Sequence, residues 1–182
     1  MPPSHRARWV AFVAEARRED TREKRLAACI SDLAAGSGQG ASAGYSGTPL
    51  VKKLGIKNGS RVGLCEAPDD FPGSLADLPE GVVPETLHRP AGGRVFDVIL
   101  LFVRERAALA RRFGAAAAAL KADGGLWVAW PKRSSGVATD LTEDRVRDVA
   151  LAAGLVDNKV CAIDATWSGL RCVYRRSARP SL

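Results

Sequence analysis

The distribution of apolar positions along the chain predicts strands and helices in alternation. Residues 96–103 (FDVILLFV) are apolar at almost every position, which is typical of a central parallel strand covered on both faces. Residues 126–130 (LWVAW) show the same pattern. The alanine-rich residues 105–122 between them predict a helix, and Gly124 and Gly125 predict a turn. This order predicts a right-handed strand–helix–strand unit.

Shorter elements surround this unit. Residues 61–66 (RVGLCE) predict a short buried strand, and residues 82–87 predict a weak strand because a proline interrupts them. After the central strands, Thr142 is placed to cap the start of a helix. Residues 159–164 and 170–175 then predict two strands joined as an antiparallel hairpin.

The first part of the chain has a different character. Residues 5–35 carry apolar side chains at helical spacing and predict two helices. Glycine and serine dominate residues 36–44, which predicts a flexible linker. Thr48 is expected to cap a short helix that Gly55 ends, and residues 75–78 are expected to form a helical turn.

These elements predict an α/β fold. We expect a short, degenerate Rossmann-like, mostly parallel sheet with a C-terminal antiparallel hairpin, preceded by two N-terminal helices. The predicted organisation is a helical appendage (1–35), a linker (36–44), the α/β domain (45–177) and a basic tail (178–182).

Composition narrows the classes of protein. The 182 residues carry a net charge of +7, and 46% of them are hydrophobic, as in an ordinary globular domain. The longest apolar run ends at Arg104, so no membrane span is expected. Charged residues also interrupt the N-terminal region before a signal-peptide core forms, which predicts a cytoplasmic location.

The four cysteines lie far apart and show no zinc-ligand spacing, so no metal site is expected. Cys161 and Cys172 are positioned to face each other across the predicted hairpin, although in the cytoplasm reduced thiols are favoured over a disulfide. Four arginines among residues 171–179 form a basic end. It suits either nucleic acid or simple solvation.

The element order resembles that of the Rossmann-like methyltransferase fold, in shortened form. Five blocks resemble an uncharacterised bacterial family, known only as a domain of unknown function, over residues 44–176. They are GYSGTPLVKKLGIK (44–57), FDVILLFV (96–103), LWVAWPK (126–132), SGVATDLTED (135–144) and GLVDNKVCAIDATWSGLR (154–171). Residues 9–36 resemble the helical tail of the bacteriocin-protection, YdeI/OmpD-associated family. In that family the tail follows a β-rich domain, which we do not expect here, so no role is carried over.

A methyltransferase-like fold implies a glycine after the first strand, where the backbone approaches the cofactor, and an acid on the second strand. Here Gly63 lies inside the first strand and Pro68 stands where that glycine belongs. Glu85 is the acid on the second strand. Because this loop departs from the expected pattern, S-adenosylmethionine is kept only as an alternative ligand. The sequence identifies no cofactor.

Polar residues follow the predicted parallel strands, at the edge where open α/β sheets bind ligands. Ten residues (131–140) separate the strand that ends at Trp130 from the helix start at Leu141-Thr142, more than the usual two to six or so. The candidate ligand-binding residues at this edge are Glu66, Asp69, Arg104, Lys132, Ser134, Ser135, Asp140 and Trp167.

Each candidate has a structural alternative. Lys132, Ser134 and Ser135 suit an anion site, or form a solvated loop that Asp140 braces. Asp69 holds a ligand beside Glu66 or caps the next helical turn. Trp167 stacks on a ligand or folds back into the core.

The sequence is compatible with three functions. No nucleophile–base pair is evident, so the favoured reading is a non-catalytic domain that binds an anionic small molecule or a protein partner. One alternative is an S-adenosylmethionine-dependent methyltransferase with an altered cofactor loop. The other is a nucleic-acid accessory protein that uses the basic C-terminus.

Overall fold

The structure, a computed structural model, describes residues 19, 23, 48–75, 77–88 and 93–179. Residues 48–182 separate from the preceding part of the chain as a unit of their own. The two helices predicted within residues 5–35, the linker at 36–44 and the end of the tail at 180–182 lie outside the described residues, apart from Glu19 and Glu23.

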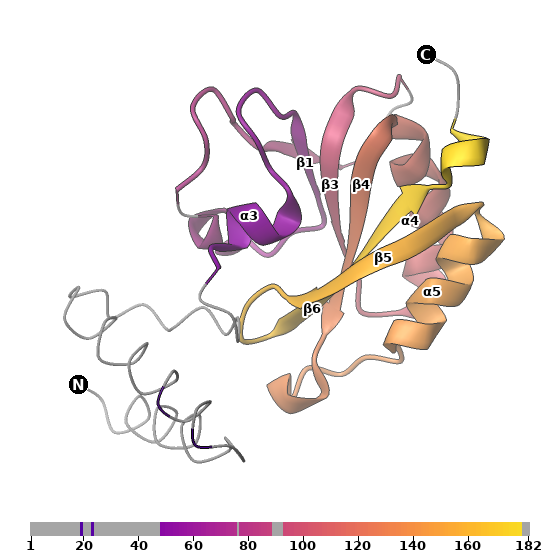
Figure 1. The fold of residues 1–182 in the computed structure, drawn as a ribbon. Coiled ribbons are helices and arrows are strands. Elements are labelled where there is room, and N and C mark those ends of the chain that lie inside the picture. The colour runs from indigo at the N-terminus through magenta and orange to yellow at the C-terminus, as the bar shows by residue number, and fades with distance from the viewer. Residues whose placement is uncertain (1–18, 20–22, 24–47, 76, 89–92, 180–182) are drawn as a thin grey trace. The chain divides into compact units, whose positions relative to one another are not determined.

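A six-stranded mixed sheet in the order β2-β1-β3-β4-β6-β5 forms the centre of this unit (Figure 1). Neighbouring strands pair in parallel from β2 to β4, and β6 pairs antiparallel with both β4 and β5. The expected α/β sheet, mostly parallel with a terminal hairpin, is therefore confirmed. The strands are β1 (Val62–Cys65), β2 (Glu85–Leu87), β3 (Phe96–Phe102), β4 (Leu120–Pro131), β5 (Leu155–Ala162) and β6 (Trp167–Tyr174).

The two most apolar segments are neighbours in this sheet, as predicted. Ile99 of β3 lies opposite Leu126 of β4, and the two strands run in the same direction. Because β6 alone runs against the other five strands of this sheet, the ends of β1, β2, β3, β4 and β5 share one edge. We call it the carboxyl edge and the opposite one the amino edge.

Helices cover the two faces of the sheet unequally (Figure 1). The helices α4 (Arg106–Ala119) and α5 (Glu143–Ala152) bury one face, in a cluster with alternate residues of β3 and β4. The short helix α3 (Leu50–Leu54) and the 3₁₀ turn η1 (Phe71–Ser74) pack on the other face. Among the helices of the described residues, none is long and apolar enough to cross a membrane.

The residues predicted to begin and end helices are confirmed in part. Thr142 caps α5 as predicted, because its Oγ1 accepts a hydrogen bond from the Arg145 backbone N–H at 3.3 Å. Gly55 ends α3 in the left-handed conformation, also as predicted. The Thr48 cap is wrong, since Pro49 takes the cap position and no side chain bonds there. The turn expected at 75–78 forms earlier, as η1.

The predicted turn at Gly124 and Gly125 is also wrong, because both residues lie inside β4. The helix α4 passes directly into the strand at Leu120. A Cβ on Gly124 would lie 2.9 Å from the Asp97 carbonyl oxygen, and one on Gly125 would lie 2.3 Å from Nε of Arg171. Close packing across the sheet therefore requires these glycines.

The cysteines do not pair across the hairpin. Cys161 lies opposite Gly169, and Cys172 lies opposite Asp157, so the expectation that the two cysteines face each other is wrong. The turn sets this register, because β6 begins at Trp167, three residues earlier than the predicted start at Leu170. Cys65, Cys161 and Cys172 are all free thiols.

Candidate functional site

The eight predicted ligand-binding residues all lie at or just beyond the carboxyl edge. Glu66 and Asp69 follow β1, and Arg104 follows β3. Lys132, Ser134, Ser135 and Asp140 belong to the connection between β4 and α5, and Trp167 begins β6 opposite Pro131. The sequence therefore identified residues of one edge, but their side chains have different partners.

Glu66 makes a sharp backbone turn directly after β1. Its φ of 52° lies in the left-handed region, which glycine adopts more easily than a residue with a side chain. Its Oε1 pairs with Nη1 of Arg112 on α4 at 2.9 Å. Pro68 follows, and Asp69 is exposed. The loop thus makes a glycine-like turn while its first carboxylate is paired with a cation.

Lys132 is the half-buried cation of this edge. Its Nζ donates a hydrogen bond to the backbone carbonyl of Asp164 at 2.5 Å, and no ion pair to it occurs within the described ranges. Burial lowers the pKa of Lys132, and the nearby Asp164 carboxylate partly offsets that shift. Arg133 and Ser134 beside it are exposed.

The side chains of Ser135 and Asp140 stabilise the β4–α5 connection through hydrogen bonds to its own backbone and to the start of α4. The hydroxyl of Ser135 donates to the Lys132 carbonyl at 2.7 Å and accepts from the Val137 N–H at 3.2 Å. Oδ1 of Asp140 accepts from the N–H of Arg106, the first residue of α4, at 2.8 Å. Asp140 therefore braces the loop against the start of α4.

Trp167 is buried, with 6% of its surface exposed. Its ring meets that of Phe102 edge to face, with centroids 5.1 Å apart. Oδ1 of Asp164 accepts the N–H groups of Thr166 and Trp167, both at 2.7 Å, which fixes the turn before β6. The ring thus packs in the core, under the edge where a ligand was expected to meet it.

Glu85, the acid predicted on the second strand, lies at the amino edge. It is the first residue of β2 and pairs with Arg61, Oε1 to Nε, at 2.6 Å just before β1. The carboxyl end of β1, at Cys65, lies opposite Leu87 at the other end of β2. Glu85 is therefore positioned to stabilise the start of the sheet.

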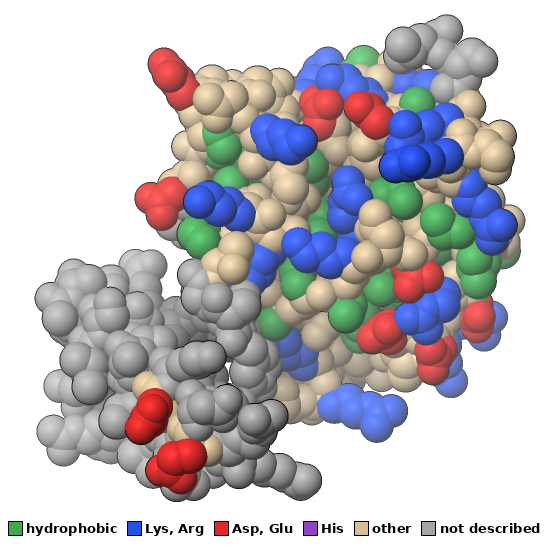
Figure 2. Space-filling view, in the orientation of Figure 1, with side chains coloured by type: hydrophobic (Ala, Val, Ile, Leu, Met, Phe, Trp, Pro, Cys, Tyr) green, Lys and Arg blue, Asp and Glu red, His purple; other side chains and the backbone are tan. Residues whose placement is uncertain are grey.

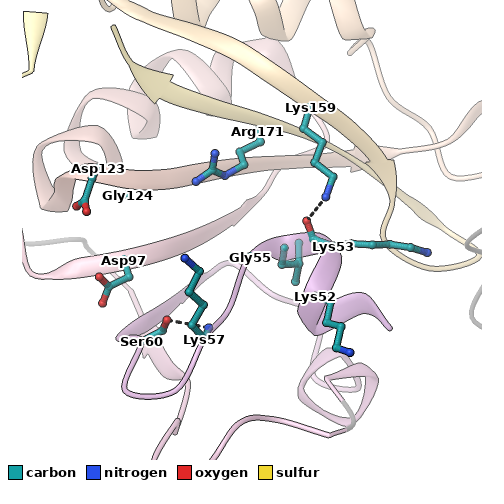
Figure 3. A pocket seen from close by; sticks show the side chains of 11 residues that line it. Lys52, Lys53, Gly55, Lys57, Ser60, Asp97, Asp123, Gly124, Lys159 and Arg171 are labelled. Carbon is teal, nitrogen blue, oxygen red and sulfur yellow. Dashed lines mark hydrogen bonds between the residues drawn. The ribbon is translucent and has the colours of Figure 1, made fainter. Parts of the chain in front are cut away.

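Sequence reasoning missed a cavity of about 330 Å³ at the amino edge, on the face that carries α3 (Figure 3). Asp97 and Asp123 line it, with five cations: Lys52, Lys53, Lys57, Lys159 and Arg171. These residues come from α3, the α3–β1 loop and four strands. No motif links positions so far apart; the one local signal was the basic Lys52, Lys53 and Lys57 group.

The described thiols are not set up as nucleophiles. Burial raises the pKa of Cys65 to about 11 and that of Cys172 to about 12, from an ordinary 9.0. Burial also raises the pKa of Cys161. In the part of the chain that the structure describes, no group of three or more His, Cys, Asp or Glu side chains is arranged to hold a metal ion.

The fold is similar to that of solved structures that include methyltransferases. The mitomycin 7-O-methyltransferase MmcR aligns with a TM-score of 0.50 at 14% identity, covering 92% of this chain and 60% of that one. A methyltransferase from Aquifex aeolicus aligns at 0.48 and 12%, covering 68% and 86%. LepI in complex with SAM aligns at 0.43 and 15%, covering 69% of this chain and only 39% of LepI. At 14% identity, the alignment with MmcR establishes the fold alone.

Sequence families divide the chain at the same place as its structure does. No protein of curated function matches it. Residues 1–36 match the family described as bacteriocin-protection, YdeI or OmpD-associated, which makes this segment similar to that family. Residues 51–176, which hold the whole sheet and both edges, match the family described as protein of unknown function (DUF3052), and the chain belongs to that family.

Proposed function

We propose that the α/β domain is a non-catalytic binding domain that holds an anionic small molecule at its carboxyl edge. The observation that carries this proposal is the half-buried ammonium group of Lys132 at the end of β4, which bonds to a backbone carbonyl. A partly desolvated cation is destabilising unless an anion or several hydrogen bonds compensate it. An anionic ligand supplies that compensation.

The charges around Lys132 support an anion over a cation. Arg104 and Arg133 are exposed at the ends of the two adjacent strands, and Ser134 offers a free hydroxyl beside them. The carboxylates of Glu66 and Asp140 at the same edge are already engaged, by Arg112 and by the start of α4. Arg104, Lys132 and Arg133 outnumber Asp164, the carboxylate whose charge acts on Lys132.

The described thiols and the described histidine support binding over catalysis. The described thiols have raised pKa values and are protonated at neutral pH. His88 is exposed and lies just beyond the edge strand β2. Positioned donors without an activated nucleophile suit a domain that recognises a ligand and leaves it unchanged.

One observation favours a second candidate, an S-adenosylmethionine-dependent methyltransferase with an altered cofactor loop. The left-handed backbone of Glu66 makes, directly after β1, the kind of turn that a glycine makes in nucleoside-binding loops. A glutamate there places a side chain where the backbone would approach the cofactor. This candidate therefore requires the Glu66–Arg112 pair to open on binding.

A thermal-shift screen of nucleotides, cofactors and phosphorylated metabolites tests the first candidate, with calorimetry on every hit. A ligand that binds the folded protein raises its melting temperature. We expect Lys132→Met to weaken an anionic hit about tenfold, the loss of one charge-assisted hydrogen bond. Lys52→Met, a charge-matched change at the other edge, should leave the affinity unchanged.

Two results would contradict the proposal that Lys132 binds an anionic ligand in a non-catalytic domain. An anionic hit that binds Lys132→Met and wild type equally well contradicts the proposed site. Tight binding of S-adenosylmethionine that survives Lys132→Met and is lost in Glu66→Ala establishes the methyltransferase candidate instead.

A further inference from the structure

The cavity at the amino edge is built around cations that point into it. In Figure 3 the side chains of Lys57 and Arg171 extend toward its centre from opposite walls, and the ammonium group of Lys159 reaches its rim. Lys52 and Lys53 also line the cavity, but their side chains turn outward. Figure 2 shows that Lys and Arg side chains gather on this face of the domain.

Arg171 is held in place by the strand beneath it. Its guanidinium lies against Gly125, so closely that a Cβ there would be 2.3 Å from Nε and 2.7 Å from Nη2. The group is half-buried, and burial lowers the pKa of Arg171. Its side-chain bond within the described residues is a long one, 3.5 Å to Oδ1 of Asn158, and no carboxylate there lies within ion-pair distance.

The two acids of the cavity do not neutralise these cations. Asp97 bonds to Nζ of Lys121 at 2.8 and 2.9 Å and to the Arg61 N–H at 2.8 Å, so its charge is used outside the cavity. Asp123 is exposed at the rim. With Asp97 paired to Lys121, the three inward cations face the one carboxylate of Asp123, which leaves an excess of two positive charges.

Lys159 has donors to spare. One of its three N–H groups bonds to the Lys53 carbonyl at 2.7 Å, beside the end of α3. The other two remain for a ligand. This bond also fixes the ammonium group at the cavity rim without a side-chain carboxylate.

We infer that the amino-edge cavity binds the phosphate group of a small phosphorylated molecule, with Arg171 and Lys57 as the main contacts and Lys159 as a third. A guanidinium fork suits a phosphate oxygen pair, and a doubly charged group matches the excess of positive charge. The volume of about 330 Å³ suits a small organic phosphate. These three contacts are not among the residues of the carboxyl-edge site proposed above.

Pyrophosphate is the probe that tests the site, titrated into the full chain at ionic strength held constant with sodium chloride. The readout is the backbone and indole N–H spectrum, because Trp127 donates to the Leu54 carbonyl in the cavity wall. We expect Lys57→Gln and Arg171→Gln each to weaken binding about tenfold. Lys52→Gln, whose side chain turns outward, should weaken it less than about twofold.

Gly125→Ala separates geometry from charge. The added methyl would displace the guanidinium of Arg171 while every charge is kept. We expect it to weaken pyrophosphate as much as Arg171→Gln does. If either strand variant unfolds, the exposed Lys57→Gln variant still decides the question, since it removes no buried contact.

Three outcomes overturn the inference. One is the absence of saturable pyrophosphate binding, and another is an equal loss in Lys52→Gln and Lys57→Gln, which indicates general surface attraction. The third is an oligothymidine that binds through Lys57 when pyrophosphate does not, which indicates a polynucleotide surface. We expect the Lys132→Met variant to bind pyrophosphate as the wild type does. Failure of pyrophosphate to bind at the amino edge would therefore not contradict the carboxyl-edge proposal.

Discussion

Replacing Trp127 with phenylalanine tests whether α3 is anchored by one hydrogen bond. Trp127 is fully buried in β4, and its Nε1–H donates to the Leu54 carbonyl at 3.0 Å. Leu54 is the last residue of α3, where carbonyl groups lack partners within the helix. Phenylalanine keeps an aromatic ring in the core but removes the donor.

The magnitude follows from two contributions. A buried carbonyl left without its partner destabilises the folded state by about 1–3 kcal/mol. The smaller ring leaves a void and loses about 1 kcal/mol of packing, a fraction of a full aromatic truncation. We therefore expect Trp127→Phe to lower the free energy of unfolding by about 2–4 kcal/mol.

Trp130→Phe is the matched control. Trp130 lies on the same strand with 7% of its surface exposed, and its indole makes no hydrogen bond to any described residue. Trp130→Phe should lower the free energy of unfolding by about 1 kcal/mol, from the loss of packing alone. Urea unfolding followed by circular dichroism measures both. Losses that agree within about 0.5 kcal/mol would refute the anchoring role of the bond.

Two further predictions concern the buried thiols and the start of α5. Because burial raises the pKa of Cys65 to about 11 and that of Cys172 to about 12, the folded chain keeps protons that the unfolded chain loses above 9.0. The free energy of unfolding should therefore fall as pH rises from 9 to 11, by up to about 1.4 kcal/mol per unit for each thiol; a Cys65→Ala, Cys172→Ala variant that keeps the same slope in urea unfolding argues against this. Thr142→Ala removes the cap of the Arg145 N–H and should lower stability by about 1 kcal/mol, whereas Thr142→Ser should retain it, as thermal unfolding can check.

The sequence predicted the centre of the sheet because its signals there are local and strong. Residues of β3 and β4 are apolar on both faces, and only a strand covered on both sides accommodates that pattern. The cap at Thr142 is equally local, since its bond reaches three residues along the chain. Such features depend little on the rest of the molecule.

The errors arose where tertiary contacts decide. A glycine pair after a helix predicts a turn, and nothing near Gly124 reveals that Arg171 will lie across the neighbouring glycine. The amino-edge cavity was missed for the same reason. Its cations come from α3, the α3–β1 loop and the strands β5 and β6, whereas the sequence prediction considered only residues that follow parallel strands.

The position of the glycines indicates how this sheet differs from a cofactor-binding one. In nucleotide-binding sheets, glycines after the first strand let the backbone approach the ligand. Here Glu66 and Pro68 occupy that loop, and the glycines that permit close approach are Gly124 and Gly125, near the amino edge. Gly125 lets the guanidinium of Arg171 lie directly on the sheet. A cation fixed on a strand loses less conformational freedom on binding than one on a loop, so this edge is preorganised for an anion.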